Sequence, residues 1–157
     1  MWWVPVWRAD QKDRPQREAA AEAGIQAFFA ERTCFAEVLI HSSRDLHAAL
    51  KQAEQVPQHG SGHAPAPGAA HTPDGSAVPQ VALVMAVREL GPTLQVGSGP
   101  LWVDGATEVK LDVHLPGLQA AQRSFSIHWR NGGAGNIKGV ATLPQDMRDA
   151  LAAGLKP

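Results

Sequence analysis

The stretch that decides the fold is EVKLDVHL, residues 108–115, in which apolar and polar side chains alternate strictly. A second alternating stretch, SFSIHWR, spans residues 124–130. Alternation with a period of two is typical of a β-strand with one buried face and one solvent-exposed face. The side chains expected to face inward are Val109, Leu111, Val113, Leu115, Phe125, Ile127 and Trp129. Both stretches are therefore predicted to be strands of a sheet with one wet face.

These two strands are expected to pair as a hairpin around residues 118–120. Because side chains alternate between faces, parity then allows Glu108 to lie opposite Arg130 and Lys110 opposite His128. Glu108 and Arg130 would form a favourable cross-strand pair of opposite charges. The register of this pair is a hypothesis that the structure can test.

Three further stretches show apolar residues at helical spacing, at 13–32, 42–55 and 143–155. Each begins with a residue that is typical of a helix N-cap. The expected caps and their capping-box partners are Asp13 with Gln16, Ser42 with Asp45, and Thr142 with Gln145. These patterns predict three amphipathic helices that pack against the sheet.

The remaining apolar runs predict the other strands. WWVPVW at 2–7 is β-prone, but its proline favours an edge strand or an extended arm. CFAEVLI at 34–40 is apolar on both faces, as expected of a covered strand. QVALVMAVREL at 80–90 is expected in the centre of the sheet, with a further strand at 92–97. Asp104-Gly105 is a hairpin signal before the alternating stretch.

This order of elements predicts an α+β fold, a mixed α/β sandwich. The expected order is β-α-β-α-linker-β-β-β-β-α, with helices packed on one face of a mostly antiparallel sheet. The length of 157 residues suits one domain, 1–157. Its Pro/Gly/Ala/His-rich segment at about 56–79 cannot bury enough surface to offset its ordering entropy. We expect this segment to be a flexible insertion within the domain.

Composition and charge exclude several classes of protein. The formal net charge is -1, so the basic stripe of a nucleic-acid-binding protein is not expected. The longest apolar run, 81–87, is far shorter than the roughly 20 residues of a transmembrane helix. Residues 1–10 do not resemble a signal peptide, so either the chain is cytoplasmic or an export signal precedes Met1. Cys34 is the single cysteine, which rules out an intramolecular disulfide.

The glycine-rich stretch WRNGGAGNIKG, residues 129–139, raises the question of phosphate binding. Counting from Gly133, the dinucleotide pattern fails because its sixth position is Lys138. The P-loop pattern also fails, because Lys138 is followed by Gly139 and not by Ser or Thr. The stretch therefore predicts a connector, whose polar rim of Arg130, Asn131 and Lys138 could contact a partner.

Two groups of histidines are candidates for chemistry. His59, His63 and His71 lie in the Pro/Gly-rich insertion, which offers no fixed ligand geometry, so neither a metal site nor a cofactor is expected. His114 and His128 lie on the wet face of the alternating strands, where acidic and basic neighbours suit general acid–base work. An ordinary solvent-exposed face has the same pattern. No catalytic motif accompanies them, so no catalytic residue is assigned and the chain is not expected to be an enzyme.

The N-terminal tryptophans Trp2, Trp3 and Trp7 allow two interpretations. They could form an arm that binds a partner, since tryptophan is common in interface hot spots. Alternatively, they belong to a terminal strand that packs into the core of the fold itself, because a bare aromatic edge would favour aggregation.

The chain also resembles a family. Its stretches 28–41, 81–115 and 125–155 resemble those of uncharacterised proteobacterial envelope lipoproteins. More remotely, the element order is similar to the periplasmic domain of the curli secretion lipoprotein and to the N-terminal domain of the Tol-Pal propeller protein. This resemblance implies a non-enzymatic accessory or assembly role on the periplasmic side of the cell envelope. Membrane attachment would then need a lipid anchor that is absent from this chain.

The function predicted from sequence is that of an interaction protein that binds a protein partner, or a second copy of itself, through sheet edges and exposed aromatic residues. The alternative is a small enzyme or ligand-binding protein that uses the His/Asp/Arg face of the C-terminal strands. The residues of the possible binding surface are Trp2, Trp3, Trp7, His114, His128, Arg130, Asn131 and Lys138.

Overall fold

The structure is a computed structural model of the 157-residue chain. It describes residues 1–32, 37–56, 81–96, 103–116, 123–136 and 138–155. Nearly all of the predicted insertion at 56–79, with His59, His63 and His71, lies outside these residues, as does Cys34.

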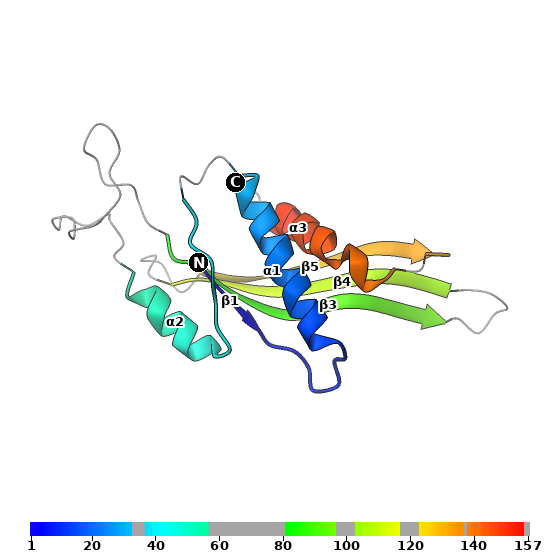
Figure 1. The fold of residues 1–157 in the computed structure, drawn as a ribbon, viewed down its shortest axis with the longest axis horizontal. Coiled ribbons are helices and arrows are strands. Elements are labelled where there is room, and N and C mark those ends of the chain that lie inside the picture. Colours follow the sequence, from blue (N-terminus) through cyan, green and yellow to red (C-terminus); the bar gives the residue numbers. More distant parts are fainter. Residues whose placement is uncertain (33–36, 57–80, 97–102, 117–122, 137, 156–157) are drawn as a thin grey trace.

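Five strands form one mixed sheet in the order β2-β1-β3-β4-β5 (Figure 1). The strands are β1 (Trp2–Pro5), β2 (His41–Ser42), β3 (Val84–Val96), β4 (Val103–Leu115) and β5 (Arg123–Ala134). β1 pairs in parallel with β2 and with β3, whereas β3–β4 and β4–β5 are antiparallel. With three helices beside this sheet, the predicted α+β class is confirmed.

The predicted register of the C-terminal strands is confirmed. Glu108 lies opposite Arg130, and Lys110 lies opposite His128. Side-chain parity explains this result, because Val109, Leu111 and Val113 of β4 are buried on the other face. A slip by one residue would move these three side chains into solvent.

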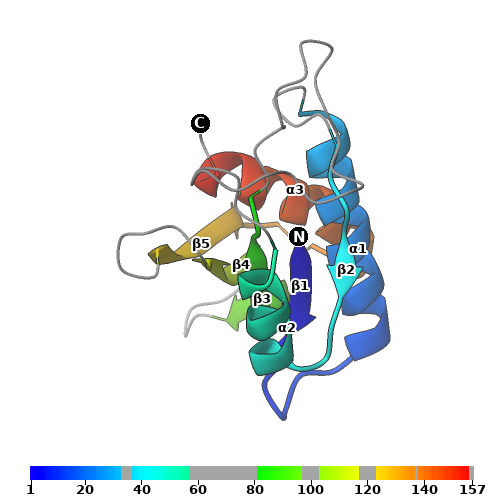
Figure 2. The ribbon, with the colours of Figure 1, turned by 90° about the vertical axis from the view of Figure 1, so that its left-hand side faces the viewer.

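The helices α1 (Arg14–Ala30) and α3 (Leu143–Gly154) cover one face of the sheet (Figure 2). They share the main core with Met85, Val87 and Leu90 of β3 and with the inward side chains of β4. α1 and α3 pack closely at Gly24, where an added Cβ would lie 2.5 Å from the Pro144 carbonyl oxygen and 2.6 Å from Met147 Cβ. Glycine at this position therefore sets how closely the two helices approach.

The third helix, α2 (Leu46–Glu54), packs on the opposite face, in a second cluster with Val4 and Val84. The expectation that all helices share one face is therefore wrong for α2. The reason lies in β1, where Trp3 points into the main core and Val4 into the second cluster. A strand that is buried on both faces needs a helix on each side.

Several predicted strand boundaries also change. Residues 37–40 are not a strand, and β2 consists of only two exposed residues that follow them. β1 is no edge strand, because β2 and β3 flank it, and Pro5 ends it. The strand predicted at 92–97 is the continuation of β3, and Asp104-Gly105 lies inside β4, so a hairpin there is wrong. In the described part of the chain, three strands follow α2, whereas four were expected.

The helix caps differ from the capping-box predictions. Asp13 precedes α1 with a left-handed φ of 56° and makes no side-chain cap. Ser42 belongs to β2, and the cap of α2 is Asp45, which accepts hydrogen bonds from the backbone amides of His47 and Ala48. Thr142 occupies the N-cap position of α3 after a 3-10 turn (Val140–Thr142), but its side chain does not cap the helix. Among the described residues, no helix is long and apolar enough to cross a membrane.

Candidate functional site: the β5 edge and its polar face

The outer edge of β5 is the longest unpaired strand edge of the sheet. β5 has 12 residues and stands at the end of the strand order, and within the described residues no strand pairs with its outer side. Figure 2 shows β5 at one margin of the sheet, with no labelled helix beyond it. The opposite margin is formed by β2, which has only two residues, and by the part of β3 after Val87, which no strand of the described residues pairs on that side.

The two faces of β5 carry different kinds of side chain. On the helix-covered face, Phe125 is 38% exposed although its pattern predicts burial, while Ile127 is buried and Trp129 is partly buried. On the other face, Ser124, Ser126 and His128 are exposed. The edge therefore has an apolar side and a polar side.

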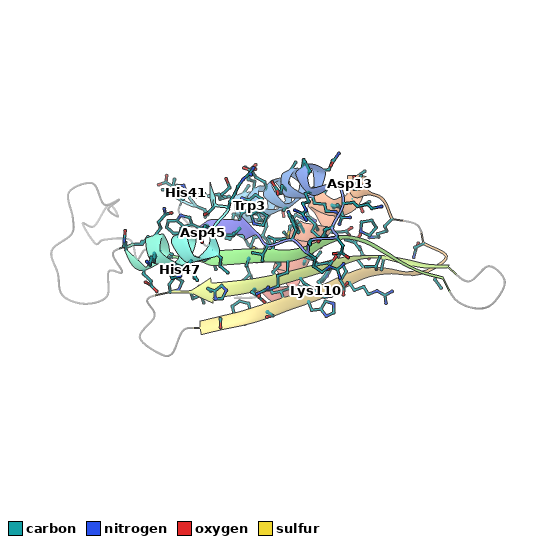
Figure 3. All side chains as sticks on the ribbon, turned by 90° about the horizontal axis from the view of Figure 1, so that it is seen from below. Trp3, Asp13, His41, Asp45, His47 and Lys110 are labelled. Carbon is teal, nitrogen blue, oxygen red and sulfur yellow. The ribbon has the colours of Figure 1, made fainter. Side chains whose placement is uncertain are left out.

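The polar face is organised by two carboxylates of β4. Glu108 Oε1 lies 2.6 Å from His128 Nε2 and 3.0 Å from Lys110 Nζ. Asp112 accepts a hydrogen bond of 2.6 Å from the Ser126 hydroxyl and a second from the Arg88 guanidinium. Figure 3 shows Lys110 on the side of the sheet away from Asp13 at the start of α1.

These contacts fix the charge of both carboxylates. Burial alone would raise the pKa of Glu108, but Lys110 and His128 lower it below its usual value. Burial likewise raises the pKa of Asp112, and the Ser126 hydroxyl and Arg88 outweigh it, so the net shift is downward. Carboxylates held ionised in this way are weak bases at neutral pH, which suits a structural network better than general base catalysis.

The arrangement also lacks other parts of a catalytic site. The Ser126 hydroxyl is directed to a carboxylate and not to a histidine, so the structure shows no activated nucleophile at this serine. The buried Nε2 atom of His114 has no hydrogen-bond partner in the described part of the chain. Two shallow surface depressions lie elsewhere, one beside Phe29 and the other beside Trp7. No group of three His, Cys, Asp or Glu in the described segments could hold a metal ion.

The glycine-rich stretch 129–139 was predicted to be a connector, but β5 continues through it to Ala134. Two of its polar side chains contact a carboxylate of the chain itself. Asp146 of α3 is 1% exposed and accepts hydrogen bonds from Asn131 Nδ2 at 2.9 Å and Lys138 Nζ at 3.0 Å. The Thr142 hydroxyl donates a hydrogen bond of 2.9 Å to Oδ2, the second carboxylate oxygen of Asp146. Asn131 and Lys138, which the sequence places on a rim for a partner, are thus brought together by a carboxylate of their own chain.

The environment of Asp146 keeps it ionised. Burial would raise the pKa of this carboxyl, but the surrounding hydroxyl, amide and ammonium donors lower it below its usual value. The buried Thr107 hydroxyl contributes to this lowering, although it has no hydrogen-bond partner of normal geometry within the described residues. Sequence reasoning did not single out Asp146. The available signal was its position among Leu143, Met147 and Ala150, where a polar residue interrupts the apolar stripe of α3.

The N-terminal tryptophans do not form an exposed arm. Trp3 is 3% exposed in the main core, so its place in the predicted binding surface is wrong. Trp2 stacks on His41 and donates a hydrogen bond to Gln52, and Trp7 donates one to Glu18. Both are partly buried. The interpretation as a terminal strand packed into the fold fits better, because Trp2 and Trp3 lie in β1, which is covered on both faces, and Trp7 packs against the main core.

The predicted residues His128 and Arg130 therefore share the exposed face of β5, and His114 lies on the neighbouring strand β4. Phe125 is the feature of this edge that sequence reasoning missed, since alternation placed it in the core. Comparisons of the chain with protein-family models, with curated proteins and with solved structures found no match.

Proposed function

We propose that this protein is a non-enzymatic interaction module that binds an extended segment of a protein partner along the outer edge of β5. The observation that carries the proposal is the 12-residue terminal strand with an exposed Phe125 at its margin. An unpaired edge offers a row of backbone donors and acceptors, and added strands commonly bind in this way.

The contrast between the two edges of the sheet supports the proposal. Proteins usually protect a free edge with a very short strand, with lysine or proline, or with a covering element. The edge at β2 follows this rule because that strand has two residues. β5 is six times as long and contains neither lysine nor proline, and its charged residues are the two arginines Arg123 and Arg130. An unpaired edge of this length can accept a partner strand.

Crosslinking in cells tests this proposal directly. A photoreactive phenylalanine analogue is placed at position 125, and, as a matched control, at Val140, an exposed apolar residue away from β5 that is 45% exposed. We expect an adduct with a discrete protein from position 125 and not from position 140. The crosslinked residues, mapped by mass spectrometry, should lie in an extended segment of the partner. Absence of a discrete adduct at 125 would refute the proposed function.

We also propose that the protein works in the bacterial cell envelope, on its periplasmic side. The support for this location is the resemblance of residues 28–41, 81–115 and 125–155 to envelope lipoproteins. Fractionation of cells that express the gene from its own locus tests it. Recovery with the periplasmic or membrane fraction is expected, and recovery with the cytoplasm alone would contradict this location.

A further inference from the structure

We infer that the strand accepted by β5 is the β5 of a second copy of this chain, paired antiparallel about Ile127, so that two sheets join into one. This inference rests on the proposed function and names its partner. A two-fold axis brings the same strand from both copies together, so the strand must be complementary to itself in the reversed direction. Three properties of β5 meet this requirement.

The first property is the extent of regular strand. β5 begins at Arg123, and Gly132 has a φ of 140°, outside the range of an ordinary strand residue. An added Cβ at Gly132 would lie 2.4 Å from the Gly105 carbonyl oxygen, so a side chain is strained there. The regular part of the edge is therefore 123–131, and its middle residue is Ile127. Pairing about Ile127 uses the whole regular edge.

The second property is the match of apolar side chains. In an antiparallel pair, residues directly opposite each other share a face. Pairing about Ile127 places Phe125 of each copy opposite Trp129 of the other, and Ile127 opposite Ile127. The 38% of Phe125 that is exposed in the single chain then faces an aromatic ring. Aromatic cross-strand pairs are among the stabilising ones in sheets.

The third property is the match on the polar face. The same register places Ser124 opposite Arg130 and Ser126 opposite His128, so no two basic side chains are directly opposed. Shifting the centre to His128 would oppose the two copies of His128 and place Phe125 opposite Asn131. Shifting it to Ser126 would place Trp129 opposite Arg123. Both alternatives lose the aromatic match, which favours the register about Ile127.

Engineered cysteines test the register. In a Cys34→Ser background, Ser124→Cys and Arg130→Cys are combined and oxidised. The two positions lie about 20 Å apart within one strand, because each residue advances roughly 3.3 Å, so they cannot form a disulfide within one chain. We expect the double variant to form disulfide-linked dimers. The two single variants are the controls, because pairing about Ile127 places neither Ser124 nor Arg130 opposite its own copy. Neither single variant should form a disulfide-linked dimer.

The association itself is measured on the purified wild-type chain by sedimentation equilibrium. We expect reversible association of the 16.7 kDa chain to a species of twice that mass. Phe125→Lys should raise the dissociation constant about tenfold, because two symmetry-related aromatic pairs are lost together. Val140→Lys introduces the same charge at a comparably exposed residue away from β5 and should leave the constant unchanged.

A monomeric wild type would overturn the inference, and so would a dimer that is insensitive to Phe125→Lys. A double-cysteine variant that shows native circular dichroism but no crosslinked dimer would also overturn it. If that variant fails to fold, sedimentation of the wild type and of Phe125→Lys still decides. A monomer that crosslinks through position 125 to a different protein would refute this inference while leaving the proposed function standing.

Discussion

Replacing the buried carboxylate of α3, Asp146→Asn, should destabilise the protein by about 2–3 kcal/mol. Asp146 is 1% exposed and holds Asn131, Lys138 and Thr142 at 2.9 to 3.0 Å. Hydrogen bonds to a charged group contribute roughly 1.5–3 kcal/mol each. The full sum overstates the loss, because the Lys138 side chain is 19% exposed and the exposed Asn131 can also turn to water. The amide of the variant also keeps one acceptor oxygen. The expected loss of stability is therefore roughly a third to a half of the summed contribution of the three hydrogen bonds.

The assay is urea unfolding followed through the fluorescence of the five tryptophans. Asp149→Asn is the matched control, because Asp149 lies on the same helix with its side chain 37% exposed. We expect the midpoint to fall for Asp146→Asn with an unchanged slope, and to stay close to wild type for Asp149→Asn. A loss below about 0.5 kcal/mol, the range of ordinary surface substitutions, would refute the argument that Asp146 anchors the connector.

The pH dependence of this difference supplies an independent check. The pKa of Asp146 is lowered in the folded protein, so its ionised form stabilises the fold. That contribution is fully present above the unfolded pKa of about 3.9 and is lost as the pH falls through the folded pKa. The gap between wild type and Asp146→Asn should therefore be constant from neutral pH to about pH 5 and shrink below pH 4. A gap that grows on acidification would contradict the lowered pKa.

Three further substitutions test other contacts by the same unfolding assay. Gly24→Ala should destabilise by about 1–3 kcal/mol through overpacking against α3, despite the better helix propensity of alanine, and a stabilised variant would contradict the close approach. Asp45→Ala should cost about 1 kcal/mol because α2 loses its side-chain cap, while Asp45→Asn should retain most of the stability. Glu108→Gln should lower the unfolding midpoint at pH 7. The lowered pKa of Glu108 predicts that this difference disappears as the pH falls below about 4, and a difference that persists there would refute it.

The parts of the fold that could be predicted are those whose pattern is local and periodic. The register of β4 and β5 followed from alternation, since Val109, Leu111 and Val113 have to share one buried face. The helices α1, α2 and α3 followed from apolar residues at helical spacing. The N-cap positions of α1 and α3, Asp13 and Thr142, were also predicted. Their side-chain caps did not form, and the cap of α2 is Asp45 instead of Ser42.

The remaining features depend on contacts between segments that are distant in sequence. WWVPVW looks like an edge because of Pro5, yet the strand lies between β2 and β3. The Asp104-Gly105 turn signal gives way to the long pairing of β3 with β4, in which Asp104 lies opposite Gln95. A local turn preference is small beside many ladder hydrogen bonds, so the tertiary pairing prevails. The face that α2 covers depends on which strands lie beneath it, which periodicity alone does not specify.

The candidate site shows the same division between local pattern and tertiary contact. His128 and Arg130 were placed on the wet face of β5 by parity, and they lie there. The role of Phe125 was missed because alternation reports which face a side chain points to, but not how far the helices extend over that face. Asn131 and Lys138 lie 15 and 8 residues before Asp146 in the sequence, so their contacts with this carboxylate were not visible in a local pattern.

The contacts on the polar face also support the binding that we propose at the edge of β5. The contacts Glu108–His128 and Ser126–Asp112 join β4 to β5 at positions opposite or diagonal in the register. They add side-chain contacts to the backbone hydrogen bonds between β4 and β5, on the inner side of β5. A strand that is already ordered before binding loses little conformational entropy on association. The remaining entropy cost then comes mainly from ordering the incoming strand. In the dimer that we propose, both strands are β5, so the same four side chains restrain each of the two strands before they pair.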